Sequence, residues 1–277
     1  GNIELGVKTG FNFWDKHFQW KKNEFYSFTA PKGRGKTLLV TALQVIASIC
    51  ADWKWIIAAQ ENSVEDYKEN LFRYLIHDDV NTVRKVDPKK YMRVRRYIND
   101  HFIFIDVDTI EQALITAKYI GDNNKEGTYA LFLDPINSFM AGYGYKGQVS
   151  YDNGAEIAKK LLDFSLTEFT VVITQHTIIS KQRENNGVVS SVHAEGGWYL
   201  NKASYTCTIN REQGSNESVF NIDNVRNRKT GGKETKLSNS FILEWSPYDI
   251  NIRMEELGSD SQTNVLKNLQ QKHRKHE

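Results

Sequence analysis

One glycine-bearing segment, Ala30-Pro31-Lys32-Gly33-Arg34-Gly35-Lys36-Thr37, constrains this chain more than any other. It follows the apolar run Phe25-Tyr26-Ser27-Phe28, which is typical of a short buried strand. It precedes Leu38-Leu39-Val40-Thr41-Ala42-Leu43, which is typical of the first turns of a helix. A strand, a glycine turn and a helix in this order form the setting of a phosphate-binding loop. The segment therefore predicts nucleotide binding within an α/β domain.

Each residue type in the loop has a physical role. Gly33 and Gly35 let the backbone curl so that successive N–H groups point inward, and the helix that follows adds its positive N-terminal end. Lys36 can reach the β- and γ-phosphates of a nucleotide, and the Thr37 hydroxyl can hold Mg²⁺. The predicted nucleotide-binding set is Ala30, Pro31, Lys32, Gly33, Arg34, Gly35, Lys36, Thr37 and Leu38. The alternative is a glycine-rich turn that exposes a basic residue.

Composition places few further limits on function. The 277 residues suffice for one large α/β domain, and 40% hydrophobic with 25% charged residues is typical of a globular protein. The net charge of +2 means that a nucleic-acid partner cannot be inferred from total charge. Cys50 and Cys207 both lie within apolar patterns, which indicates reduced, buried thiols and a cytosolic setting. The sequence holds no apolar run long enough to span a bilayer, so no membrane partner is expected.

Periodicity predicts a mostly parallel sheet with helices on both faces. Apolar strands are expected at 53–59, 102–106, 129–134 and 170–174, and helices at 37–51, 63–76, 109–121 and 155–164. Residues 78–100 are predicted to be a helical excursion whose basic side chains form a solvated face, with a nucleic-acid site as the less common alternative. From residue 203 the period changes to two, which predicts late antiparallel strands at 205–209, 219–222 and 241–245. We expect one domain over 1–256 and a polar, weakly ordered tail over 257–277.

Hydrolysis of a nucleoside triphosphate needs a carboxylate near Mg²⁺, a group that orients water, and cations that absorb the developing charge. Asp134 ends a wholly apolar strand, where such a metal-linked carboxylate is expected; otherwise it simply starts the turn before Pro135. Glu61 ends the strand that follows the loop's helix, and it could polarise water or serve as an acid at the start of the next helix.

Basic residues at other strand ends are candidates for contacts with the phosphates. His176 could contact a γ-phosphate, although a lone histidine at a strand end is more often a structural donor. Arg226 and Arg228 lie where a late strand meets a turn and could stabilise phosphate charge; a solvated strand end is the commoner explanation.

The motifs as a whole resemble those of ring-forming replicative helicases. The resemblance is carried, in order, by Val7-Lys8-Thr9-Gly10-Phe11, the phosphate loop, Ala58-Ala59-Gln60-Glu61-Asn62-Ser63-Val64-Glu65, Leu131-Phe132-Leu133-Asp134, Val171-Val172-Ile173-Thr174-Gln175-His176 and Arg226-Asn227-Arg228-Lys229-Thr230-Gly231. The chain is similar to the RecA-like motor domain of the DnaB-like group, especially to phage primase-helicases and mitochondrial Twinkle. The resemblance covers residues 5 to about 245.

The resemblance implies a RecA-like P-loop NTPase core and assigns roles by position. Lys36 and Thr37 would bind phosphate and Mg²⁺, Glu61 would be the catalytic base, Asp134 the metal-linked carboxylate and His176 the γ-phosphate sensor. Arg228 would be an arginine finger and Arg226 its companion, both reaching into a neighbouring subunit's site. The available cations for single-stranded DNA would be Lys146, Lys181, Arg183 and Lys202.

The expected function is an ATP- and Mg²⁺-dependent DNA helicase that acts as a homo-hexamer on single-stranded DNA, with primase or other replisome proteins as possible partners. The expected setting is a phage-encoded protein in the host cytoplasm. One alternative is a RecA-type recombinase that forms a filament on DNA. Another is an ATP-regulated scaffold or helicase-loading module, which would not need a water-orienting carboxylate.

Overall fold

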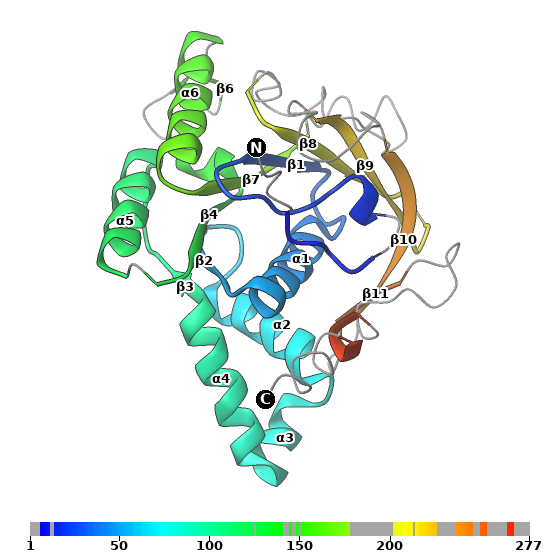
Figure 1. Cartoon of the computed structure of the whole chain (residues 1–277). Coiled ribbons are helices and arrows are strands. Elements are labelled where there is room, and N and C mark those ends of the chain that lie inside the picture. Colours follow the sequence, from blue (N-terminus) through cyan, green and yellow to red (C-terminus); the bar gives the residue numbers. More distant parts are fainter. Residues whose placement is uncertain are drawn as a thin grey trace.

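The computed structural model describes residues 6–11, 14–124, 126–140, 144–145, 148–149, 151–177, 202–212, 214–225, 237–245, 250–253 and 265–268. Within these residues, one large sheet has the strand order β11-β10-β9-β8-β1-β7-β4-β2-β3 (Figure 1). Its strands are β1 (Phe25–Ala30), β2 (Trp53–Ala59), β3 (Phe102–Phe104), β4 (Thr128–Asp134), β7 (Thr170–His176), β8 (Tyr205–Asn210), β9 (Glu217–Val225), β10 (Leu237–Trp245) and β11 (Ile250–Arg253). A separate small hairpin pairs β5 (Gly144–Tyr145) with β6 (Gln148–Val149).

The core of the sheet is parallel, as its apolar strands predict. β1 pairs with β7, β7 with β4, β4 with β2 and β2 with β3, all in parallel register. One late strand differs from the prediction, because β8 lies parallel beside β1 instead of antiparallel. Only the strands after it, β9, β10 and β11, add in antiparallel order. The parallel part of the sheet therefore extends to both sides of β1, the strand that carries the phosphate loop.

Helices cover both faces of the sheet (Figure 1). One face packs on α1 (Lys36–Ala51), α2 (Val64–Ile76) and α4 (Pro88–His101), and the other packs on α5 (Ile110–Asn123) and α6 (Tyr151–Thr167). Alternation along each strand separates the two cores: Phe28 and Phe132 belong to the first, whereas Leu131 and Ile173 belong to the second. Short 3₁₀ turns occur at Trp14–Lys16 and Ile136–Phe139.

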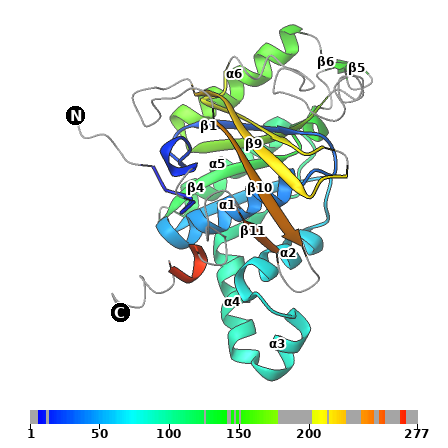
Figure 2. The same ribbon diagram turned by 90° about the vertical axis from the view of Figure 1, so that its right-hand side faces the viewer.

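The basic excursion forms two helices, α3 (Val80–Val86) and α4, which project from one end of the molecule (Figure 2). The break falls at Asp87 because Pro88 has no backbone N–H and suits the first turn of a new helix. Asp87 accepts a hydrogen bond from the Lys90 N–H and caps α4. α2 is capped in the same way, since the Ser63 side chain accepts from the Asp66 N–H.

Three smaller expectations can be compared with this fold. Cys207 is buried, whereas Cys50 is only partly buried. Within the predicted tail, Val265 and Leu266 are buried against the first core, and the domain boundary at residue 256 stays a prediction. Among the described residues, none of the helices has the length and apolar character needed to cross a membrane.

Candidate active site

The phosphate loop leaves β1 at Ala30 and enters α1 at Lys36. Gly33 and Gly35 have φ angles of 72° and 79°, in the left-handed region that a residue without a Cβ adopts at least cost. Gly35 is the N-cap of α1 and has no side chain that could accept from the first-turn N–H groups. These N–H groups therefore remain available to an anion at the positive end of the helix.

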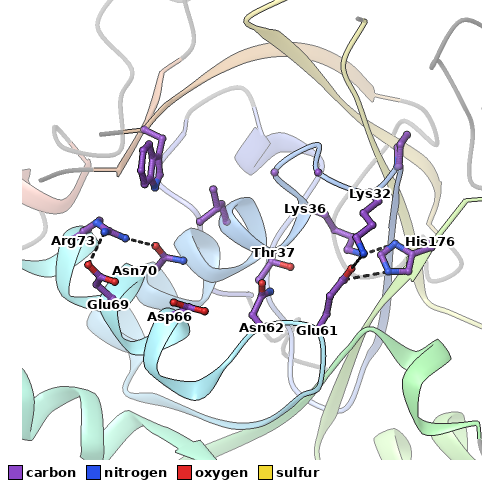
Figure 3. Close-up of a pocket in the computed structure, with 15 residues that line it drawn as sticks. Lys32, Lys36, Thr37, Glu61, Asn62, Asp66, Glu69, Asn70, Arg73 and His176 are labelled. Carbon is purple, nitrogen blue, oxygen red and sulfur yellow. Dashed lines mark hydrogen bonds and ion pairs between the residues drawn. The ribbon is translucent and has the colours of Figure 1, made fainter. Parts of the chain in front are cut away.

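The loop opens into a cleft of about 630 Å³, shown in Figure 3. The cleft is lined by Pro31, Lys32, Gly33, Gly35, Lys36, Thr37, Leu38, Glu61, Asn62, Asp66, Glu69, Asn70, Arg73, His176 and Trp245. Ala30 and Arg34 belong to the predicted nucleotide-binding set but are not among these described lining residues. The side chains form two groups: Lys32, Glu61 and His176 lie near Lys36, and Glu69, Asn70 and Arg73 lie along α2 (Figure 3).

The sheet brings the predicted metal-binding residues together. Thr37 lies in the first turn of α1, and its hydroxyl donates a 2.8 Å hydrogen bond to Oδ2 of Asp134, which is fully buried at the end of β4. A hydroxyl and a carboxylate are hard oxygen donors, and Mg²⁺ is commonly held by one or two such protein groups together with substrate phosphates. No group of three His, Cys, Asp or Glu side chains within the described ranges could hold a metal ion by itself. Thr37 and Asp134 therefore fit Mg²⁺ that arrives with a nucleotide.

Lys36 and His176 are in contact beside this pair. Lys36 is 5% exposed, and its Nζ lies 3.4 Å from Nδ1 of His176. Burial lowers the pKa of Lys36, against the opposing effect of the nearby Asp134 and Glu61 carboxylates. A bound phosphate would add negative charge beside the Lys36 ammonium and favour its protonated form.

Glu61 approaches His176 from the end of β2. The ends of β2 and β4 are aligned because the Gln60 backbone N–H donates a 3.2 Å hydrogen bond to the Asp134 carbonyl oxygen. Glu61 Oε2 lies 3.1 Å from His176 Nε2, and Glu61 Oε1 lies 3.3 Å from Lys32 Nζ. Partial burial acts to raise the pKa of Glu61, but His176, Lys32 and Lys36 outweigh it, so the pKa lies below the ordinary value.

The surroundings of His176 favour one protonation state and one tautomer of its ring. Burial and then Lys36 lower the pKa of His176, although Glu61 and Asp134 act in the opposite direction. At neutral pH we therefore treat the imidazole as neutral, which makes its contact with Glu61 a hydrogen bond instead of an ion pair. A neutral ring can accept from Lys36 at Nδ1 and donate to Glu61 from Nε2. His176 thus connects Lys36 of the phosphate loop to Glu61, the candidate base.

The far part of the cleft contains residues that the sequence did not suggest. Arg73 on α2 donates to Asn70 Oδ1 at 2.9 Å and to Glu69 Oε1 at 2.7 Å, and its guanidinium carbon lies 5.4 Å from the ring centroid of Trp245. Trp245 ends β10 and is 55% exposed. An exposed indole held by a cation can stack on a planar ring such as a nucleobase. Near the phosphate loop, Arg211 donates to the Gly33 carbonyl oxygen at 3.3 Å.

The remaining predicted residues are not in this cleft or lie outside the described ranges. Arg226, Arg228, Lys146, Lys181 and Arg183 fall outside the described residues. Lys202 is half-buried just before β8 and does not line the cleft. The proposed roles of these six residues therefore stay predictions.

A phosphate loop between β1 and α1, facing an acidic residue at the end of β4 in a mostly parallel sheet, is the arrangement of the RecA-like P-loop fold. No protein-family model and no curated protein sequence matches the chain. Solved structures do match it. One of them, the ATPase domain of another protein, superposes with a TM-score of 0.67 at 14% identity, over 90% of this chain and 92% of that one.

A DnaB-like replicative helicase, solved in a study that includes its interactions with primase, gives the same TM-score of 0.67 at 14% identity. It covers 90% of this chain, which spans 62% of that protein's length. The fold of the chain is therefore that of the ATPase domains of DnaB-like replicative helicases, as the motif order predicts.

Proposed function

We propose that this chain is the ATP-driven motor domain of a replicative DNA helicase, which translocates on single-stranded DNA and unwinds duplex as a hexameric ring. The observation that carries this proposal is the continuous set of contacts from Lys36 through His176 to Glu61, placed beside the Thr37–Asp134 pair at the phosphate loop. A protein that only binds nucleotide needs the loop but has no use for a carboxylate held in the same cleft.

The cleft suits ATP along its whole length. The N–H groups at the start of α1 and the Lys36 ammonium would bind the phosphates, and Trp245 with Arg73 would hold the base. Thr37 and Asp134 would hold Mg²⁺, which when bound would supply positive charge to the phosphates. One cleft therefore offers groups for both ends of a nucleotide.

Glu61 would orient the attacking water. Its two oxygens contact Lys32 and His176 in this structure. A γ-phosphate would attract Lys32 and Lys36 away from Glu61. A Glu61 carboxylate oxygen would then be free to accept a hydrogen bond from water. His176 contacts both Lys36 and Glu61, so it would register the change at the lysine and transmit it to the base. This is the role that we propose for His176 as a γ-phosphate sensor.

The assembly and the DNA contacts complete the proposal. Arg228, with Arg226 as its companion, would complete the site of a neighbouring subunit and absorb charge during phosphoryl transfer. Single-stranded DNA would be held in the central channel by Lys146, Lys181, Arg183 and Lys202. Primase or other replisome proteins are the proposed partners, in the cytoplasm of a host cell infected by a phage that encodes the protein.

Unwinding of a labelled forked DNA tests this function, with the particle mass measured in the same buffer. We expect strand separation that requires ATP and Mg²⁺, stops when the ATP is replaced by a non-hydrolysable analogue, and accompanies a hexamer-sized particle. Open filaments on DNA without strand separation would support the recombinase alternative instead. Slow hydrolysis that DNA does not stimulate would support the scaffold or loading alternative.

A further inference from the structure

The Asp134 carboxylate has a second hydroxyl partner besides Thr37. Its Oδ2 accepts from the Thr37 hydroxyl at 2.8 Å, and its Oδ1 accepts from the Thr174 hydroxyl in β7. Asp134 and Thr174 are both fully buried. They lie side by side because β4 and β7 are in parallel register, with Leu133 opposite Ile173 one residue earlier.

We propose that Thr174 is a positioning residue that fixes the orientation of Asp134 for Mg²⁺ binding, an inference that rests on the proposed ATPase function. With a single hydroxyl partner the carboxylate could turn about its side-chain bonds. With one threonine on each oxygen, Oδ2 stays directed at Thr37, the other candidate magnesium ligand. Outer partners of this kind commonly set the orientation and affinity of metal-binding carboxylates.

The position of Thr174 also ties the magnesium site to the base. Thr174 and His176 are two residues apart in β7, so their side chains leave the same face of the strand, one toward Asp134 and the other toward Glu61. Gln175, between them, points to the opposite face and donates to the Ser27 hydroxyl of β1 at 2.7 Å. The end of β7 is thus anchored on one face and holds both functional carboxylates on the other.

The test removes the Thr174 hydroxyl with a valine of nearly the same volume and compares it with two variants that both lack the threonine methyl group. Thr174→Val removes the donor, Thr174→Ser keeps it, and Thr174→Cys retains only a weak donor. Thr170→Val is the matched control, because Thr170 is an equally buried residue of β7 whose hydroxyl donates instead to the Lys21 carbonyl oxygen at 2.7 Å. Binding of a fluorescent ATP analogue is measured at increasing Mg²⁺ and, separately, in EDTA, with thermal unfolding recorded for every variant.

We expect Thr174→Val to need about tenfold more Mg²⁺ for half-maximal enhancement of binding, as the loss of a hydrogen bond to a charged group implies. Thr174→Ser should restore the wild-type requirement, Thr174→Cys should fall between the two, and Thr170→Val should match the wild type. Binding in EDTA should be the same for all of these proteins. If Thr174→Val does not fold, the comparison of Thr174→Cys with Thr174→Ser decides.

Two results would overturn the proposal in different ways. If wild-type protein shows Mg²⁺-enhanced binding and the folded valine or cysteine variant has an unchanged Mg²⁺ requirement, Thr174 does not position Asp134, while the nucleotide site stands. If the wild type does not bind the analogue at any Mg²⁺ concentration, the ATPase function fails and the role of Thr174 fails with it.

Discussion

His176 Nε2 lies 3.1 Å from Glu61 Oε2, so that one contact joins the end of β7 to the end of β2 across the intervening strand β4. The other ring nitrogen of His176 faces Lys36. A single neutral imidazole thereby links the lysine of the phosphate loop to the candidate base. Its protonation would disrupt the contact with Lys36, since a charged ring has no acceptor left for the ammonium.

Stability should depend on pH through His176. Its pKa is lowered from the ordinary value of 6.5 by burial and by Lys36, so below that pH the unfolded chain binds protons more readily than the folded protein. The free energy of unfolding should therefore fall as the pH drops through 6.5 toward the lowered pKa of the folded state. Urea denaturation between about pH 7.5 and about pH 5.5 should show a smaller fall in His176→Asn. Equal falls in the two proteins would contradict the predicted environment of the ring.

Removing the loop lysine should weaken nucleotide binding. Lys36→Met loses a charge-assisted contact with phosphate, which corresponds to an affinity loss of roughly ten- to a hundredfold. Lys159→Met is the control, because Lys159 on α6 is exposed, pairs with Asp163 and lies outside the cleft. Calorimetric titration with ATP and Mg²⁺ measures both variants. Wild-type affinity in Lys36→Met would exclude the loop as the phosphate site.

Trp245 should contribute to ATP binding only by stacking on the nucleobase. Trp245→Ala should weaken ATP binding by about tenfold, within the range for loss of one base–aromatic stack. The same change should leave binding of inorganic tripolyphosphate, which has no base, at its wild-type value. Trp245→Phe should retain most of the ATP affinity. An equal loss for both ligands in Trp245→Ala would show that the tryptophan supports the loop instead of stacking on the base.

The two loop glycines should differ in their tolerance of alanine. Both have positive φ, so each substitution strains the backbone by about 1 to 2 kcal/mol. At Gly33 a new Cβ would meet nothing within 4 Å, whereas at Gly35 it would lie 3.3 Å from Cδ2 of Leu243. Gly35→Ala should therefore lower the free energy of unfolding more than Gly33→Ala, as measured by chemical denaturation. The reverse order would be inconsistent with the packing of β10 on the loop.

Local sequence signals predicted much of this structure. The glycine loop, the apolar strand before it and the helix after it are each determined by neighbouring residues, and each is present. Asp134 and Glu61 could be singled out because parallel strands bring their carboxyl ends to one edge of the sheet. His176 follows the same rule.

What the sequence did not predict depends on long-range pairing. Its period-two pattern identified β8 as a strand but could not show that β8 would lie parallel beside β1. Arg73 and Trp245 are far apart in the chain, and only the packing of α2 near the end of β10 brings them together. Thr174 was indistinguishable from the other β-branched residues of its strand until its register with Asp134 was known.

The most direct test of the motor proposal is the rate of ATP hydrolysis with and without single-stranded DNA, in wild type, Glu61→Gln and Glu65→Gln. Glu65 is the matched control, an exposed glutamate in the first turn of α2 that does not line the cleft. We predict DNA-stimulated hydrolysis in the wild type and Glu65→Gln, and a loss of at least about a hundredfold in Glu61→Gln. Hydrolysis that DNA does not stimulate, and that Glu61→Gln leaves intact, would contradict both the motor function and the role of Glu61.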